Sequence, residues 1–306
     1  MLQKINYYDE HVHLRPHHTP PPSHRLAPMV EEAGEKGIEI GVREHAPLPE
    51  AFRLGPRKDY YFAMAPEEVE AFLNQFRGRP VRLGLEVDFF PEAFEEIKAG
   101  VEAILLRARQ MEIPIAALHG AVHLLPGNID DIPDRPAGFG WVMWDDTETH
   151  FRQLLEARGV PQLIEDYHDL LAAMIQTEYF QVVAHLELIR KFDRTDERGN
   201  SIYFAPYENL YEEAMFDVLA LAARHGTAVE INTQGIDRPL GRPFLSPKMV
   251  AYCVQKHIPI CFGSDAHQPH EIGRYFDRAA RMFVEAGGKK PVYFVNQKPE
   301  YWTLPA

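Results

Sequence analysis

The chain has 306 residues and a mass of 35.1 kDa, with 45 acidic and 32 basic side chains and a formal net charge of −13. Such a surface repels a phosphodiester backbone, so we expect no nucleic-acid partner. Two cysteines exclude both a disulfide scaffold and a cysteine-based zinc site. Neither a signal peptide nor an apolar run of about 18–20 residues occurs, so we expect a cytoplasmic protein with no membrane partner. Fifteen histidines are many for this length and need an explanation.

Short apolar runs alternate with longer amphipathic stretches along the chain. The runs expected to be strands are residues 5–12, 38–42, 81–89, 113–125, 182–188, 227–231, 258–262 and, as a last candidate, 292–295. The stretches expected to be helices are residues 27–36, 66–76, 92–110, 147–157, 163–177, 206–224, 247–256 and 270–286. This alternation predicts an α/β protein with a parallel sheet, in one domain spanning residues 1–306. Within it, residues 16–28 are a proline-rich loop, and residues 126–146 are an ordered loop insertion near the site.

Each of the first seven expected strands runs into polar residues near its carboxyl end. In chain order these are Asp9-Glu10-His11-Val12-His13, Arg43-Glu44-His45, Glu86-Val87-Asp88, His123, His185, Glu230-Ile231-Asn232 and Asp265-Ala266-His267. In parallel α/β proteins, ligands and catalytic groups gather at the carboxyl ends of the strands. The seven ends therefore predict a single cluster on one face of the sheet.

The spacing and chemistry of these residues indicate a metal site. His11 and His13 are two apart, so on a strand their side chains share one face, and the same holds for Asp265 and His267 if the chain stays extended there. Imidazole and carboxylate ligands suit zinc, iron or manganese. A tetrahedral ion needs about four ligands, so nine candidates imply two or three divalent ions, with Glu86 as a natural bridge. The nine are His11, His13, His45, Glu86, His123, His185, Asp265, His267 and one histidine of the proline-rich loop, His17 or His18.

The order of these motifs resembles the PHP (polymerase and histidinol phosphatase) family of metal-dependent hydrolases, and within it the monofunctional histidinol-phosphate phosphatase branch. The matching segments are DEHVH at 9–13, REHAPLP at 43–49, LGLEVDFFP at 83–91, GAVHLLP at 120–126, AHLELIRKF at 184–192, EINTQGIDRP at 230–239 and GSDAH at 263–267. The resemblance spans roughly residues 5–295. It implies a distorted (β/α)7 TIM-like barrel and a phosphomonoester hydrolase acting on a small substrate, with histidinol phosphate favoured.

The resemblance also implies how the ligands divide among three ions. One ion would lie among His11, His13, Glu86 and Asp265. A second would lie among Glu86, His123 and His185. The third would be held by His45, His267 and a histidine of the proline-rich loop, for which we favour His18 over His17.

The same resemblance suggests roles for the other residues of the site. Catalytic roles fall to Glu86, Asp265 and His267. Basic residues after the fifth and sixth strands would bind the phosphate: Arg190 or the neighbouring Lys191, and Arg238. Arg15 and Arg43 are further basic residues near the site, and Arg15 is included among the phosphate-binding candidates, whereas Arg242 is interpreted as a surface residue.

Several polar neighbours of the ligands have open roles. Glu10 and Asp88 are either carboxylates that orient imidazoles or exposed charges at strand ends. Asp9 fits an orienting role better, because it matches the first acid of the family motif. His119 is either a core residue or a support for the ligands, and the two cysteines are interpreted as structural.

Other functions remain as alternatives. Another PHP phosphoesterase would act on a nucleotide or a small phosphodiester. An amidohydrolase barrel also begins with HxH, but it usually has a carbamylated lysine and lacks the D-x-H motif. A degenerate PHP domain serving as an interaction module would have lost ligands, which are nearly all present here. The native metals and the oligomeric state are left open.

Overall fold

The computed structural model describes residues 6–14, 26–52, 63–127 and 140–305. The strands are β1 (Tyr7–Val12), β2 (Ile38–His45), β3 (Arg82–Asp88), β4 (Ile115–Ala121), β5 (Leu124–Pro126), β6 (Trp141–Met143), β7 (Val182–Val183), β8 (Ala228–Asn232), β9 (Ile260–Gly263), β10 (Val292–Val295) and β11 (Lys298–Tyr301). The α-helices are α1 (Leu26–Lys36), α2 (Val69–Asn74), α3 (Phe94–Gln110), α4 (Glu148–Arg158), α5 (Val160–Gln176), α6 (Glu208–His225), α7 (Pro247–Gln255) and α8 (Phe276–Glu285).

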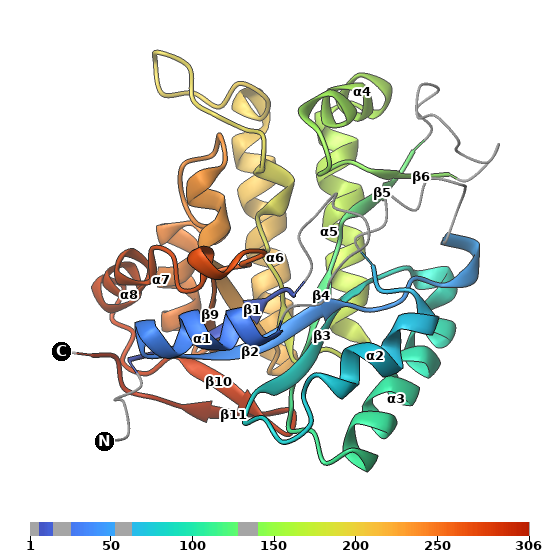
Figure 1. The fold of residues 1–306 in the computed structure, drawn as a ribbon. Helices are drawn as coiled ribbons and strands as arrows, with labels where there is room; N and C mark the ends of the chain where they lie inside the picture. Colours follow the sequence, from blue (N-terminus) through green and yellow to red (C-terminus); the bar gives the residue numbers. More distant parts are fainter. Residues whose placement is uncertain (1–5, 15–25, 53–62, 128–139, 306) are drawn as a thin grey trace.

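Seven parallel strands form the central sheet, in the order β1-β2-β3-β4-β7-β8-β9. The sheet curls until β1 approaches β9, and the helices lie outside it (Figure 1). The predicted distorted (β/α)7 barrel is confirmed. Every described residue of β3, β4 and β8 is buried, as expected for strands covered by helices on one side and a filled interior on the other.

The barrel is closed between β1 and β9 by a few contacts at the carboxyl end of the strands. Val12 and Ala266 form a parallel bridge. The His13 N–H donates to the Ala266 carbonyl at 2.8 Å, and the Asp265 N–H donates to the His11 carbonyl at 2.8 Å. These contacts form a seam between β1 and β9, and three of its residues, His11, His13 and Asp265, are predicted metal ligands.

Local sequence signals explain where several helices begin and end. The Thr147 side chain accepts a hydrogen bond from the His150 N–H at the start of α4, and Ser246 accepts one from the Met249 N–H at the start of α7. Gly226 ends α6 with a φ of 68°, the left-handed conformation that glycine adopts without strain. These caps satisfy backbone groups that the helix ends would otherwise leave without a partner.

The last candidate strand is not part of the parallel barrel. Residues 292–295 form β10, which pairs with β11 in a separate antiparallel sheet. This hairpin lies beside the amino-terminal ends of the barrel strands (Figure 1), where Tyr293 stacks on Tyr8 with ring centroids 4.0 Å apart. It therefore covers the end of the barrel opposite the predicted site.

The interior near the amino-terminal end holds a buried ion network. Glu10 accepts hydrogen bonds from the guanidinium groups of both Arg43 and Arg82, and Arg82 also contacts Glu39 at 2.9 Å. A Cβ atom on Gly84 would lie 2.8 Å from Arg43 Cδ and 2.1 Å from a backbone oxygen. Glycine at this position therefore makes room for a large charged side chain inside the barrel.

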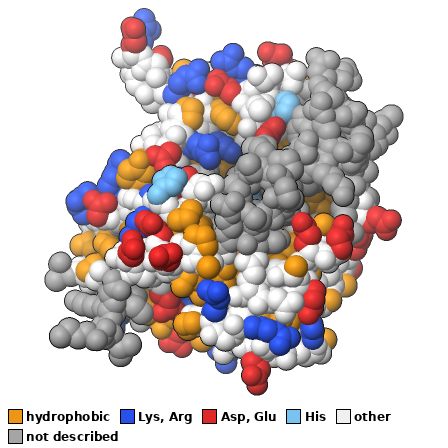
Figure 2. Space-filling view, in the orientation of Figure 1, with side chains coloured by type: hydrophobic (Ala, Val, Ile, Leu, Met, Phe, Trp, Pro, Cys, Tyr) orange, Lys and Arg blue, Asp and Glu red, His pale blue; other side chains and the backbone are white. Residues whose placement is uncertain are grey.

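The expected insertion at residues 126–146 is partly described. Its flanks form the antiparallel hairpin β5–β6, while residues 128–139 lie outside the described residues. On the face shown in Figure 2, acidic and basic side chains are interspersed. Among the described helices, none combines the length and apolarity needed to cross a membrane.

Candidate metal centre

Six of the seven barrel strands bring a predicted ligand to their carboxyl ends. His11 lies in β1 and His13 just after it, His45 ends β2, and Glu86 lies in β3. The remaining ligands follow β4, β7 and β9: His123, His185, Asp265 and His267. Within the described ranges, all eight of these side chains are buried or nearly so. The predicted convergence of the strand ends is therefore what the structure shows.

Glu86 is the centre of this cluster. Its Oε1 lies 2.7 Å from His185 Nε2 and 3.5 Å from His123 Nε2. Its Oε2 lies 3.1 Å from His45 Nδ1 and 3.4 Å from the Nε2 atoms of both His11 and His13. The two carboxylate oxygens thus face different groups of imidazoles, which is the arrangement expected of a bridging ligand.

Asp265 completes the group around the HxH pair. Its Oδ1 lies 3.3 Å from His13 Nε2, and the Nε2 atoms of His11 and His13 are 3.0 Å apart. The chain is not extended at Asp265, whose φ is 53°. The condition on which strand periodicity would place Asp265 and His267 on one face is therefore not met, and they approach each other, with His267 Nδ1 3.6 Å from Asp265 Oδ1, through a left-handed residue instead.

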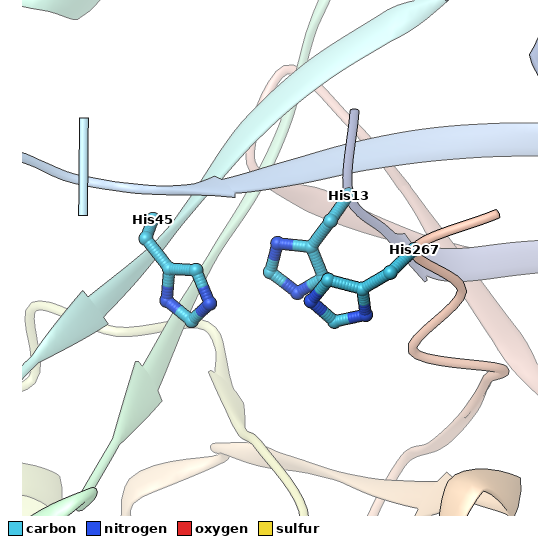
Figure 3. Close-up of side chains that lie close together, drawn as sticks. All are labelled: His13, His45 and His267. Atoms are coloured by element: carbon cyan, nitrogen blue, oxygen red, sulfur yellow. The ribbon is translucent and has the colours of Figure 1, made fainter. Parts of the chain in front are cut away.

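His13, His45 and His267 form a third group, in which one ligand atom from each lies within 4.8 Å of the others. The rings of His13 and His267 stack with centroids 4.3 Å apart, and those of His13 and His45 with centroids 4.4 Å apart (Figure 3). His267 Nδ1 lies 3.0 Å from the Asp265 carbonyl oxygen, so this nitrogen carries the proton and Nε2 carries the lone pair.

Carboxylates on neighbouring strands orient two of the rings through Nδ1. Glu230 Oε1 lies 2.8 Å from His11 Nδ1, and Asp88 Oδ1 lies 2.8 Å from His123 Nδ1. A carboxylate on the far nitrogen fixes the tautomer of a metal-ligating histidine and its ring plane. The orienting role considered for Asp88 is confirmed, whereas the role of Glu230 was missed, although its position at a strand end could have indicated it.

Asp9 contacts the chain beside the predicted ligands through backbone groups rather than through an imidazole ring. Its carboxylate accepts hydrogen bonds from the backbone N–H groups of Ser264 and Gly273 and from the Ser264 hydroxyl. It also accepts one from the backbone N–H of His11, and no imidazole among the described residues donates to it. Glu10 fits neither of its two suggested roles, because it is buried against Arg43 and Arg82.

The electrostatic environment keeps the carboxylates ionised. Burial raises the pKa of Glu86, but the imidazoles of His45, His11 and His123 lower it more, and the result lies well below the usual value. The pKa of Asp265 lies well below its usual value for the same reason.

The imidazoles divide into two classes. Burial lowers the pKa of His13 and His123, but contacts with carboxylates outweigh burial and raise these values to about 9 and about 10. Burial, reinforced by His13, places the pKa of His267 well below its usual value. The cluster therefore contains neutral imidazole as well as imidazoles whose protons a cation must displace.

The donor set fits divalent metal ions. The Nε2 atoms of His11 and His123 point toward Glu86, because their Nδ1 atoms are hydrogen-bonded to carboxylates. Neither Glu86 nor Asp265 forms an ion pair with lysine or arginine in the described part of the chain. Buried carboxylates whose partners are imidazoles, rather than permanently charged lysine or arginine, favour an external cation. Thiolates are excluded, since both cysteines are buried elsewhere and free.

The predicted phosphate-binding residues differ in how fully their side chains are already paired within the protein. Arg190 is held by Asp193 and Glu208, and Lys191 donates to Asp145. Arg238 contacts Gln234 Oε1 at 3.3 Å, and Gln234 in turn donates to the backbone carbonyl of Asp265.

Two other basic residues have structural partners. Arg242 is not simply a surface residue, because it forms a two-pronged ion pair with buried Glu187. Arg43 donates to His119 Nδ1 at 2.9 Å, which makes His119 a core residue beneath the cluster. Arg15, His17 and His18 lie outside the described residues.

Comparison with known proteins supports the predicted resemblance. Over 287 residues the chain is 28% identical to a Deinococcus radiodurans protein named "Probable histidinol-phosphatase", covering 92% of this chain and 94% of the relative. Over 285 residues it is 27% identical to a Bacillus subtilis protein named "Histidinol-phosphatase", covering 88% and 96%. The chain is homologous to histidinol-phosphatases. No family model matches it.

Solved structures of similarly named proteins share the fold. A histidinol phosphate phosphatase (HisK) from Lactococcus lactis aligns with a TM-score of 0.64 at 21% identity, covering 96% of this chain and 99% of that one. That protein was crystallised with zinc, L-histidinol and phosphate. A candidate histidinol phosphatase, HisK, from Listeria monocytogenes aligns with a TM-score of 0.70 at 20% identity, covering 89% and 99%.

Proposed function

We propose that this protein is a metal-dependent histidinol-phosphate phosphatase, which converts L-histidinol phosphate and water into L-histidinol and phosphate. The observation that carries the proposal is the position of Glu86, whose two oxygens face separate groups of imidazoles in a homologue of histidinol-phosphatases. Such a bridge suits two ions placed side by side, the usual arrangement for hydrolysis of phosphate esters.

The described residues would hold at least two divalent ions. His11, His13, Glu86 and Asp265 would hold one, and Glu86, His123 and His185 another. His45 and His267 would hold a third, together with His13 or the loop residue His18. Zinc, iron and manganese all suit these ligands.

Bound ions would lower the pKa of a water molecule to about 7 and neutralise phosphate oxygens. The protein's own residues fix where this happens. Glu86 contacts both ligand groups at once. The left-handed backbone of Asp265 places its carboxylate beside His13 and His267. Glu86, Asp265 and His267 are the residues to which we assign catalytic roles.

Arg238 is the phosphate-binding candidate that the geometry favours. It is partly buried, and of its side-chain nitrogens only Nε has a hydrogen bond to a described residue, Gln234. Arg190 would have to exchange its contacts with Asp193 and Glu208 before it could bind a phosphate. A guanidinium with both terminal nitrogens available can bind two phosphate oxygens at once.

The test is phosphate release by the metal-loaded protein from histidinol phosphate, a nucleoside monophosphate and a model diester, with metal content measured on the same sample. We expect turnover of histidinol phosphate to exceed that of the other two substrates. Arg238→Ala should raise KM for histidinol phosphate more than Arg194→Ala, which removes a half-exposed arginine paired with Glu148. Turnover of the diester alone would instead support a phosphodiesterase. A full metal content with no turnover would support an interaction module.

A further inference from the structure

Strand β8 contributes no predicted metal ligand, although the six other strands of the barrel each contribute at least one. Its inward-facing residues are Glu230 and Asn232, which are two apart and fully buried. Both side chains contact predicted ligands from other strands. Strand β8 therefore contacts the metal centre through residues that the sequence did not assign as ligands.

The Glu230 carboxylate joins two ligand groups. Oε1 lies 2.8 Å from His11 Nδ1, and Oε2 accepts a hydrogen bond from the backbone N–H of His185 at 2.9 Å. His11 belongs to the group with Asp265, whereas His185 belongs to the group with His123. One carboxylate thus contacts the imidazole ring of His11 in one group and the backbone N–H of His185 in the other.

The backbone contact acts where the chain is strained. His185 has a φ of 26°, in the region that residues other than glycine rarely adopt. The hydrogen bond from its N–H to Glu230 supports this conformation, which directs the imidazole toward Glu86. Loss of the carboxylate would release that constraint.

Asn232 links Glu230 to a third predicted ligand, Asp265. Its Nδ2 donates to Glu230 Oε2 and to Asp265 Oδ2, both at 3.2 Å. Asp265 is also a left-handed residue, with a φ of 53°. The Glu230–Asn232 pair therefore contacts ligands that come from β1, β7 and β9.

The neighbouring strand is shaped to accommodate this carboxylate. A Cβ atom on Gly263 would lie 1.7 Å from Glu230 Oε1 and 2.7 Å from His11 Cβ. Gly263 has no left-handed backbone that would require glycine. Glycine is needed here because Glu230 and His11 occupy the space that a Cβ atom would fill.

We infer that Glu230, supported by Asn232, is a positioning residue that couples the two halves of the metal centre. It holds His11 and His185 at the separation that Glu86 needs to bridge them. The inference rests on the proposed function in using the same metal centre, but it concerns how the centre is held rather than which ester it cleaves.

The test measures zinc affinity by competition with a chelator, together with zinc stoichiometry by elemental analysis. Glu230→Gln keeps the volume but leaves one oxygen for three donors, which are the His11 ring, the His185 N–H and the Asn232 amide, so we expect about 10–100-fold weaker zinc binding. Gly263→Ala should weaken it in the same direction without changing any charge, because the methyl group displaces Glu230. In both variants, excess zinc should restore much of the kcat for histidinol phosphate.

The matched control is Glu187→Gln, which alters an equally buried glutamate that contacts Arg242, Tyr211 and the Ser246 N–H. It should lower the midpoint of urea unfolding while leaving zinc affinity within about twofold of the unaltered protein. If Glu230→Gln and Gly263→Ala bind zinc as tightly as Glu187→Gln, the inference is overturned, whatever substrate the unaltered protein cleaves. Failure of the unaltered, zinc-loaded protein to hydrolyse histidinol phosphate would overturn the proposed function alone.

Discussion

The two ends of the barrel both bury charged side chains, but they balance them differently. Near the amino-terminal end, Glu10 is neutralised within the protein by Arg43 and Arg82. Near the carboxyl end, Glu86 and Asp265 face imidazoles, and their ion pairs within the described residues involve no lysine or arginine.

The difference separates a structural network from a binding site. A buried ion pair made by fixed side chains is complete in the folded chain and has no charge left for a ligand. Carboxylates surrounded by neutralisable imidazoles gain stability when a cation enters. Charge burial alone therefore does not identify a site, whereas the identity of the partners does.

The strongest test of this contrast is Glu86→Gln. Removing the bridge should abolish binding of a full metal set and lower turnover of histidinol phosphate about 1000-fold, since metal ions contribute several kcal/mol of charge stabilisation. In the metal-free state at neutral pH the variant should be less stable than the unaltered protein, because the imidazoles that hold the pKa of Glu86 well below its usual value stabilise the ionised carboxylate in the folded chain. Metal analysis, phosphate release and urea unfolding measure these effects. Unchanged metal content would contradict the bridging role.

Glu10→Gln applies the same exchange to the other end. It leaves two buried guanidinium groups without their shared carboxylate, so we expect the free energy of unfolding to fall by about 3 kcal/mol. Metal stoichiometry should stay as it is in the unaltered protein. Glu39→Gln is the control, because Glu39 is the partly exposed partner of Arg82 and its loss should cost less than about 1 kcal/mol. Loss of metal from Glu10→Gln would show that the two ends are not independent.

A smaller effect follows from protons at the carboxyl end. The pKa values of His13 and His123 are raised to about 9 and about 10, so these rings hold protons at neutral pH until a cation displaces them. Metal affinity should therefore rise with pH between 6 and 8, by up to about tenfold per unit for each proton displaced. Calorimetric titration of the metal-free protein with zinc, in two buffers of different ionisation enthalpy, measures the protons released. Equal heats in both buffers would rule out this competition.

The sequence predicted those parts of the site that depend on strand order. A ligand at a strand end must lie near the other strand ends of a parallel barrel, so His11, Glu86 and His185 could be brought together without coordinates. The positions of Asp9 and Glu10 could not be predicted in this way. Whether an acid beside a ligand orients a ring, binds backbone or pairs with arginine depends on which neighbouring strand it faces and in what register.

Side chains beyond the strands were the least predictable. Arg190 follows its strand as the family resemblance requires, but the turn that carries it also carries Asp193, which binds the guanidinium. Glu230 was visible at a strand end, yet only the structure shows that its carboxylate contacts the Nδ1 atom of His11. Such distinctions rest on rotamers and turn geometry, which residue spacing does not specify.

The seam between β1 and β9 also constrains the order in which the site can be made during synthesis. The ligands on β1 to β4 emerge from the ribosome early, but Asp265 and His267 follow near the end of the chain. The seam hydrogen bonds between residues 11–13 and 265–266 require both ends of this span. Because growing chains fold from the amino terminus onward, a nascent chain carries a partial set of these ligands until β9 and the residues after it have been made. Binding of metal by the whole predicted set would therefore have to follow the synthesis of residues 265–267.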